Sequence, residues 1–172
     1  LVDAFPMANG FPITDEQSGY SLDNPYDNRD PRLSEYILFN GSMYKDTEII
    51  TGSYSSDNNG LNKTATSTRT GYYMRKLLRD DCSPNPAAPL AKYHYPVYIR
   101  YTEIFLAYAE AANEAWGPTG TGENTYSAYD VIKAIRKRAG IGTENGDAYL
   151  ESIKNNKDLM RELIRNERRI EL

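Results

Sequence analysis

The sequence contains very few of the residues that build disulfides, metal centres and nucleophilic triads. It has one cysteine, Cys82, and one histidine, His94, in 172 residues. A single cysteine excludes an internal disulfide and a cysteine-based zinc cluster. A single histidine has no second imidazole to share a metal, so we interpret His94 as a packed or hydrogen-bonded side chain. The sequence therefore predicts no metal site and no cofactor.

Motifs for catalysis and phosphate binding are missing as well. The chain lacks G-x-S-x-G, H-E-x-x-H and a glycine-rich loop placed after a strand. No EF-hand spacing occurs, although the many Asp and Asn residues of the loops leave calcium binding open. The missing motifs argue against a serine hydrolase, a zinc metalloprotease and a nucleotide-binding protein with a glycine-rich phosphate loop.

Positive charge and long apolar runs are also scarce. The chain has 20 Lys and Arg against 24 Asp and Glu, a net charge of −4. Proteins that bind nucleic acid usually have a large excess of positive charge, so the net charge of this chain argues against a nucleic-acid partner. No apolar run approaches the roughly 20 residues that span a bilayer.

Tyrosine is the residue type in excess, with 15 tyrosines against one tryptophan and four phenylalanines. A tyrosine ring is apolar and its hydroxyl is polar, so an excess suits recognition surfaces. The alternative is that these rings simply pack irregular loops.

The composition changes near Pro96. Residues 1–95 are rich in Gly, Asn, Asp, Ser, Thr and Pro, which is typical of loops and turns. Within them, residues 47–52 read as a short strand, and residues 34–39 could be helix or strand. We predict a loop-rich lobe over 1–95 and helices over 96–172.

The first predicted helix lies within residues 98–117 and ends at Gly117-Pro118. Its one-sided apolar spacing predicts a buried stripe made of Tyr101, Ile104, Phe105, Tyr108, Ala112 and Ala115.

The second predicted helix lies within residues 127–140. Ser127 is a good N-cap, and Asp130 can complete a capping box. Gly140 stands where a left-handed C-terminal residue belongs.

The third predicted helix begins with Asp158 as its N-cap and continues to the last residue. Glu167 falls on its apolar face, where a carboxylate is costly unless it is paired. We therefore predict that Glu167 pairs with Arg136 or Arg138 of the preceding helix.

Two groups of charged residues could have a chemical role. Glu103 and Glu110 lie two helical turns apart, roughly 10.5 Å along the axis, which exceeds the usual carboxylate separation of a glycosidase. We interpret them as partners of Arg100. Residues 27–33, "DNRDPRL", could hold a ligand through their arginines, but we favour an ion network that anchors a loop.

Six segments together resemble the C-terminal part of the SusD/RagB family of Bacteroidetes outer-membrane glycan-binding lipoproteins. They are "LVDAFPMANGFPI" (1–13), "NPYDNRDPRLSEYILFNGSMY" (24–44), "TGYYMRKLL" (70–78), "YPVYIRYTEIFLAYAEAANEAWG" (95–117), "IRKRAGI" (135–141) and "IRNERRIEL" (164–172). Their order along the chain matches the family.

The resemblance implies a mainly α fold of tetratricopeptide-like helical hairpins with an irregular loop-rich lobe. It also implies that the chain is a fragment truncated at both ends. The intact protein would be a non-catalytic lipoprotein on the cell outer membrane, exposed at the surface and anchored outside this fragment. It would capture oligosaccharides, polysaccharides or peptides and deliver them to a SusC-like TonB-dependent transporter for nutrient uptake.

Sugars have apolar C–H faces and a rim of hydroxyls, so flat rings and amide groups suit them. On that ground we expect six loop residues to bind the ligand, namely Tyr20, Tyr26, Asn28, Asn40, Tyr44 and Tyr54.

Two alternatives stay open. A peptide or protein-interaction module would use an exposed groove along 99–115 and 127–138, as repeat proteins use a concave face. A glycoside hydrolase would need two carboxylates facing each other across a cleft.

Overall fold

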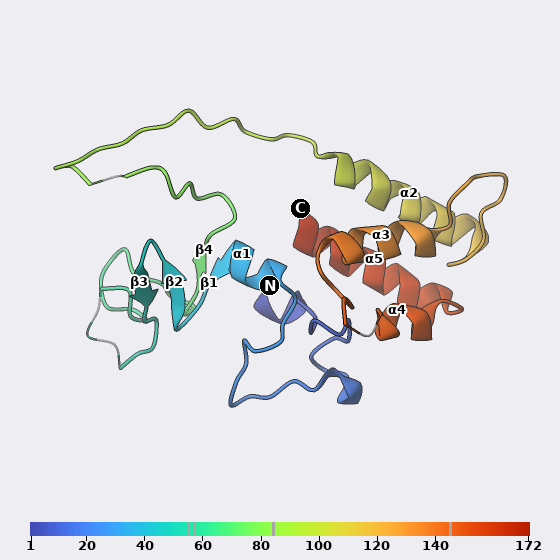
Figure 1. The fold of residues 1–172 in the computed structure, drawn as a ribbon, viewed down its shortest axis with the longest axis horizontal. Helices are drawn as coiled ribbons and strands as arrows, with labels where there is room; N and C mark the ends of the chain where they lie inside the picture. The colour runs from blue at the N-terminus through green and yellow to red at the C-terminus, as the bar shows by residue number, and fades with distance from the viewer. Residues whose placement is uncertain (55, 57, 84, 145) are drawn as a thin grey trace. The chain divides into compact units, whose positions relative to one another are not determined.

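The computed structural model describes residues 1–54, 56, 58–83, 85–144 and 146–172. Two compact units are present (Figure 1). The first, here called the helical unit, consists of Leu1–Pro31 and Val97–Leu172. The second, the loop-rich unit, is Arg32–Pro96. Each unit is described by itself below.

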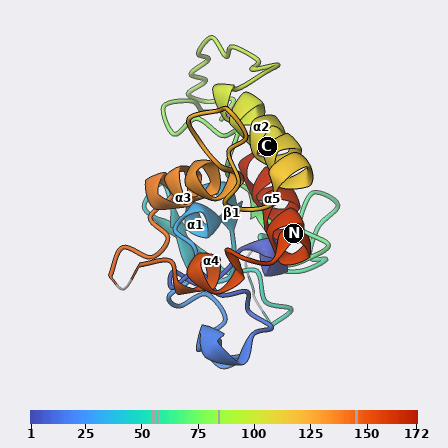
Figure 2. The same cartoon turned by 90° about the vertical axis from the view of Figure 1, so that its right-hand side faces the viewer.

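Three long helices form the core of the helical unit. They are α2 (Tyr101–Trp116), α3 (Ala128–Arg138) and α5 (Lys157–Glu171). Helix α2 packs against both α3 and α5, as Figures 1 and 2 show. The short helix α4 (Ala148–Ile153) packs against α5. The core side chains are mostly aliphatic and include Leu106, Val131, Ile132, Ile135, Leu150, Met160, Leu163 and Ile164. This arrangement confirms the predicted mainly α fold built from helical hairpins.

The ends of α2 and α3 follow their sequence signals. The Ser127 hydroxyl accepts a hydrogen bond from the Asp130 backbone N–H at 3.2 Å, and the Asp130 carboxylate accepts one from the Ser127 N–H at 3.0 Å. This is the predicted capping box. Gly140 has a φ of +89°, the left-handed conformation expected after α3. Gly117, with a φ of +78°, ends α2.

The predicted start of the last helix was wrong by two residues. Its N-cap is Asn156, whose side chain accepts hydrogen bonds from the N–H groups of Asp158 and Leu159, both at 3.1 Å. Asp158 lies inside the first turn, where a negative charge complements the helix dipole. Helix α4 was not predicted because its six residues are too few to show a helical period.

The predicted buried stripe of α2 was also wrong in part. Four of its six residues are exposed, namely Tyr101 (76%), Ile104, Phe105 and Ala115. The core side is formed instead by Leu106 and Ala109, which are fully buried. Apolar residues occupy both faces of this helix, so the sequence pattern could not identify the face that packs inward.

Residues 1–31 lie against the helices although their composition is that of loops. The segment contains the 3₁₀ helices η1 (Val2–Ala4) and η2 (Glu16–Ser18). Helix η1 contacts α5, and the Asn166 amide donates a hydrogen bond to the Ala4 carbonyl at 2.8 Å. Composition thus predicts that this segment is irregular, but it does not predict that the segment packs with the helical unit.

The loop-rich unit contains short elements. Helix α1 (Arg32–Tyr36) leads directly into β1 (Ile37–Leu38), so the ambiguous segment 34–39 contains both kinds of structure. Strand β1 pairs antiparallel with β4 (Tyr73–Met74), and β2 (Ser42–Tyr44) pairs antiparallel with β3 (Thr47–Ile49). Lys45 and Asp46 connect β2 to β3 with φ values of +48° and +62°, as a tight primed hairpin turn requires.

Candidate functional site

A polar pocket of about 390 Å³ lies in the helical unit between three stretches of loop. One wall is residues 7–9, a second is Ser18, Gly19 and Asn28, and the third is Thr143 and Glu144. The lining therefore offers amide, hydroxyl and carboxylate groups beside the Met7 side chain. Such a mixture can hydrogen-bond a polar ligand at several points.

Asn9 connects the first two walls of the pocket. Its amide nitrogen lies 3.3 Å from the Gln17 carbonyl and 3.2 Å from the Ser18 carbonyl, to which it donates. Its side-chain oxygen accepts a hydrogen bond from the Phe11 N–H at 3.1 Å. The Ser18 hydroxyl in turn accepts from the Tyr20 N–H at 3.2 Å. These bonds fix the loop around η2 in position beside residues 7–9.

Asn28 is presented by an unusual backbone conformation. Its φ is +52°, in the left-handed region that asparagine tolerates better than most residues. The Asn28 carbonyl accepts a hydrogen bond from the Ala8 N–H at 2.7 Å, and Met7 forms an isolated antiparallel bridge with Arg29. The backbone of Asn28 is thus held while its side chain stays exposed.

The third wall is a turn that follows α3. The Gly142 N–H donates to the Ala8 carbonyl at 2.8 Å and thereby ties this turn to the first wall. Gly142 has a φ of +67°, and a Cβ there would collide with the backbone of Gly146 and Asp147. Only glycine fits this position without displacing the turn that carries Thr143 and Glu144.

A buried ion network supports the loops that form the pocket. The Arg136 guanidinium binds the Glu167 carboxylate at 2.8 Å, the Asp147 carboxylate, and the Gly10 carbonyl at 2.9 Å. Burial by itself would lower the pKa of Arg136, but Glu167 and Asp147 outweigh it and raise that pKa above its usual value. The prediction that Glu167 pairs with Arg136 or Arg138 is confirmed for Arg136. Arg138 binds Glu171 instead, at 2.6 Å.

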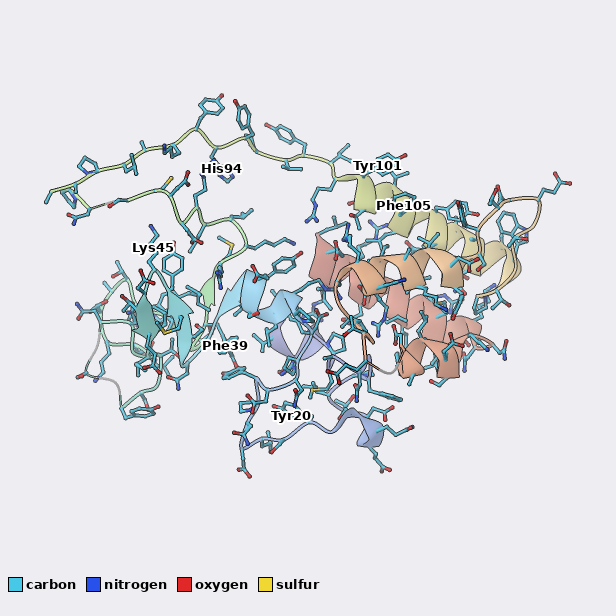
Figure 3. All side chains as sticks on the ribbon, in the orientation of Figure 1. Tyr20, Phe39, Lys45, His94, Tyr101 and Phe105 are labelled. Atoms are coloured by element: carbon cyan, nitrogen blue, oxygen red, sulfur yellow. The ribbon has the colours of Figure 1, made fainter. Side chains whose placement is uncertain are left out.

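The six predicted ligand residues are divided equally between the two units. Three lie in the helical unit. Asn28 lines the pocket. Tyr20 follows the lining residue Gly19, is half-buried, and has the Arg29 guanidinium 5.5 Å from its ring centroid. Tyr26 is half-buried. Figure 3 labels Tyr20 on its loop.

The other three lie in the loop-rich unit. The Asn40 side-chain oxygen accepts hydrogen bonds from the N–H groups of Thr51 and Gly52 at 3.0 and 3.2 Å, so this amide is used to hold the loop. Tyr44 is half-buried beside Lys45, whose ammonium lies 5.6 Å from the ring centroid. Tyr54 is 79% exposed. Ligand binding by these side chains stays a prediction.

Sequence reasoning missed Asn9, Ser18, Thr143 and Glu144. The only local signal was the Asn9-Gly10 pair, which is a common turn sequence. Thr143 and Glu144 come near Asn28 because the chain returns after α3, and no local pattern encodes such a long-range approach.

The arginines of segment 27–33 are buried, and Arg29 anchors its loop through backbone carbonyls. Arg29 donates to the carbonyls of Val2, Phe5 and Pro25 at 2.7–2.8 Å. Arg32 is buried as well, with 5% of its surface exposed. The three hydrogen bonds of Arg29 hold the loop.

Glu103 and Glu110 do not pair with Arg100, contrary to the prediction. Both approach Arg168 of α5, with 3.9 Å between Glu110 and the guanidinium. Arg100 instead contacts Glu171, at 3.5 Å. The two carboxylates thus share one cation and do not face each other across a cleft.

A second hollow lies between α2 and α3. This groove, of about 590 Å³, is lined mainly by apolar side chains, among them Tyr101, Phe105, Tyr126, Val131 and Ile135. Figure 3 shows Tyr101 and Phe105 on the first turns of α2. The groove coincides with the one that we described as the mark of a protein-interaction module.

Two absences concern only the part of the chain that the structure describes. Within it, no group of three or more His, Cys, Asp or Glu side chains could hold a metal ion. The helices of the same residues are all too short or too polar to cross a membrane.

Comparison with known proteins places the chain in a family. The model of the SusD family matches residues 1–172. The chain therefore belongs to the SusD family. No curated protein matches it.

Two solved structures from Bacteroides fragilis are similar over almost the whole chain. One, a SusD-like carbohydrate binding protein, has a TM-score of 0.67 and 29% sequence identity, over 99% of this chain and 31% of its own. The other, a SusD-like protein, has a TM-score of 0.60 and 26% identity, over 99% of this chain and 32% of its own. The chain thus spans about a third of the length of these relatives.

Proposed function

We propose that this chain binds oligosaccharide or polysaccharide, without catalysis, in the polar pocket of its helical unit. The pocket carries this proposal because it presents the amide of Asn28, the hydroxyl of Thr143 and the carboxylate of Glu144 around one hollow. Those groups match the hydroxyls of a sugar. Membership of the SusD family and the similar SusD-like carbohydrate binding protein support this assignment.

The wider role belongs to the same proposal. The intact protein would be a lipoprotein on the outer face of the bacterial outer membrane, anchored outside these residues. There it would deliver its oligosaccharide to a SusC-like TonB-dependent transporter for nutrient uptake. The pairing of Glu103 and Glu110 with one arginine supports the non-catalytic part of the proposal, since glycoside hydrolysis needs carboxylates on both sides of the bond.

Affinity electrophoresis through gels that contain single polysaccharides tests the proposal. The variant Asn28→Gly removes the pocket amide and still permits the positive φ of this position. The matched control is Asn62→Gly, because Asn62 is also an exposed asparagine with a positive φ of 56° and lies in the other unit. We expect at least one polysaccharide to slow the wild type and the control, and to slow Asn28→Gly about fivefold less. No retardation by any polysaccharide would contradict the proposal.

The apolar groove favours a second candidate function, the docking of an amphipathic helix from a partner protein. The exposed face of α2 is apolar from Tyr101 to Phe105. On α3, Arg138 lines the groove and is exposed, so an acidic flank on the incoming helix would complement it.

A fluorescent 18-residue peptide with leucines at i, i+3, i+4 and i+7 and glutamates along one flank tests this second function. We expect its anisotropy to rise with the wild type and to stay unchanged with Phe105→Asp. A scrambled peptide of the same composition is the control. Equal responses from both peptides would contradict helix docking.

A further inference from the structure

The segment that forms two walls of the pocket carries almost only negative charge. Residues 1–31 contain six acidic side chains and a single basic one, Arg29. The acidic residues are Asp3, Asp15, Glu16, Asp23, Asp27 and Asp30. All except Asp30 are exposed or half-buried.

The single cation of this segment is turned away from solvent. The Arg29 side chain is buried, and its two terminal nitrogens already donate to three backbone carbonyls, those of Val2, Phe5 and Pro25. A ligand in the pocket therefore cannot gain a contact with this guanidinium unless the loop is dismantled.

The third wall adds another negative charge. Glu144 is the one charged residue among those that line the pocket, and its side chain is exposed. Two arginines of α3 precede this wall along the chain. Arg138 is paired with the Glu171 carboxylate. Arg136 is 1% exposed and is shared between the carboxylates of Asp147 and Glu167. That cluster has one cation and two anions, so it contributes no positive charge to a ligand.

We propose that the pocket selects uncharged sugar residues and rejects sugars that carry a carboxylate or a sulfate. This inference rests on the proposed function and names the substrate class of that site. A carboxylate placed about 5 Å from Glu144 in water is disfavoured by about fourfold, and more in the lower dielectric of a pocket. The exposed acidic residues of segment 1–31 add a longer-range repulsion at about 10 mM salt, where the Debye length is about 30 Å.

A matched pair of ligands tests the selection. Any neutral polysaccharide that retards the chain is oxidised at its primary hydroxyls to carboxylates, which adds charge and leaves the backbone and linkage unchanged. Retardation by both forms is then compared at about 10 mM and at 0.15 M salt. We expect the oxidised form to bind at least fivefold more weakly at low salt, with a smaller ratio at 0.15 M salt.

Variants of Glu144 assign this preference to the pocket. We expect Glu144→Gln to reduce the ratio between the two forms, and Glu144→Lys to bring it to one or below. Glu123 is an exposed glutamate on the loop after α2, so Glu123→Lys makes the same change of net charge elsewhere and should leave the ratio unchanged. Circular dichroism of each variant verifies that it is folded.

The outcomes separate this inference from the proposed function. Equal binding of both forms, or tighter binding of the oxidised one, would overturn the charge selection while glycan capture stands. Equal effects of Glu144→Lys and Glu123→Lys would overturn the role of the pocket in selection. If no polysaccharide of either kind is bound, glycan capture itself fails and the inference fails with it.

Discussion

The Arg136 guanidinium lies 2.8 Å from the Glu167 carboxylate, and the two side chains are 1% and 0% exposed. The pair joins α3 to α5, and Arg136 also donates to the Gly10 carbonyl in the loop that leads to the pocket. A buried charge whose partner is removed is left uncompensated, whereas the intact pair roughly balances its own desolvation. The pair therefore couples the helical core to the geometry of the pocket.

Glu167→Gln is expected to lower the free energy of unfolding by about 1.5–3 kcal/mol, because it replaces the charged acceptor of a buried Arg136 hydrogen bond while Asp147 still compensates the guanidinium. Urea denaturation measures this change. Glu162→Gln, on the exposed face of the same helix, is the control and should change stability by less than about 0.5 kcal/mol. Similar effects of the two substitutions would refute the role assigned to the pair.

The packing register of α2 gives a second prediction. Leu106 is fully buried whereas its neighbour Phe105 is 45% exposed. Leu106→Ala should therefore cost about 2–5 kcal/mol of stability, and Phe105→Ala less than about 1.5 kcal/mol. Thermal unfolding of both variants measures the difference. A larger loss for Phe105→Ala would mean that α2 packs with the face predicted from sequence.

The capping box of α3 gives a third prediction. Ser127→Ala removes the side-chain acceptor for the Asp130 N–H and should cost about 0.5–2 kcal/mol. Ser127→Asp keeps an acceptor and should restore part of the loss, which urea denaturation of the two variants can measure. Equal stability of the alanine variant and the wild type would show that the cap contributes nothing.

Acid should weaken the link between α2 and α5. A hydrogen bond from Arg161 lowers the pKa of Glu114 from 4.5 to about 2. Because the folded-state pKa is depressed, this contribution to stability is present above about pH 4.5 and is lost as the pH falls towards 2.

Melting temperatures of the wild type and Glu114→Gln, measured from pH 7 to pH 2, test that dependence. The wild type should be the more stable of the two at neutral pH, and the two curves should converge between pH 4.5 and 2. A constant separation across that range would show that Glu114 is not held in its charged form by the fold.

The sequence predicted those features that depend on local signals. Ser127, Asp130 and Gly140 identified the ends of α3 because capping chemistry acts within a few residues. The pairing of Glu167 with an arginine of α3 could be predicted because a carboxylate on an apolar face needs a buried cation, but the choice between Arg136 and Arg138 needed the structure.

The predictions that were wrong concern features that depend on contacts with distant parts of the chain. Because α2 has apolar residues on both faces, the sequence alone does not show which face packs against α3 and α5. The partner of Glu103 is Arg168, 65 positions along the chain, and sequence offered only the nearby Arg100. The pocket likewise needs Asn28 and Glu144 together, which only the tertiary fold achieves.

The most direct measurement is a titration of the ¹⁵N-labelled chain with a retarding polysaccharide fragment, followed by amide chemical shifts. The account predicts shifts concentrated at residues 7–9, 18–19, 28 and 143–144, around the pocket. Shifts concentrated along the α2–α3 groove, or on the loop-rich unit alone, would contradict it and place the binding surface elsewhere.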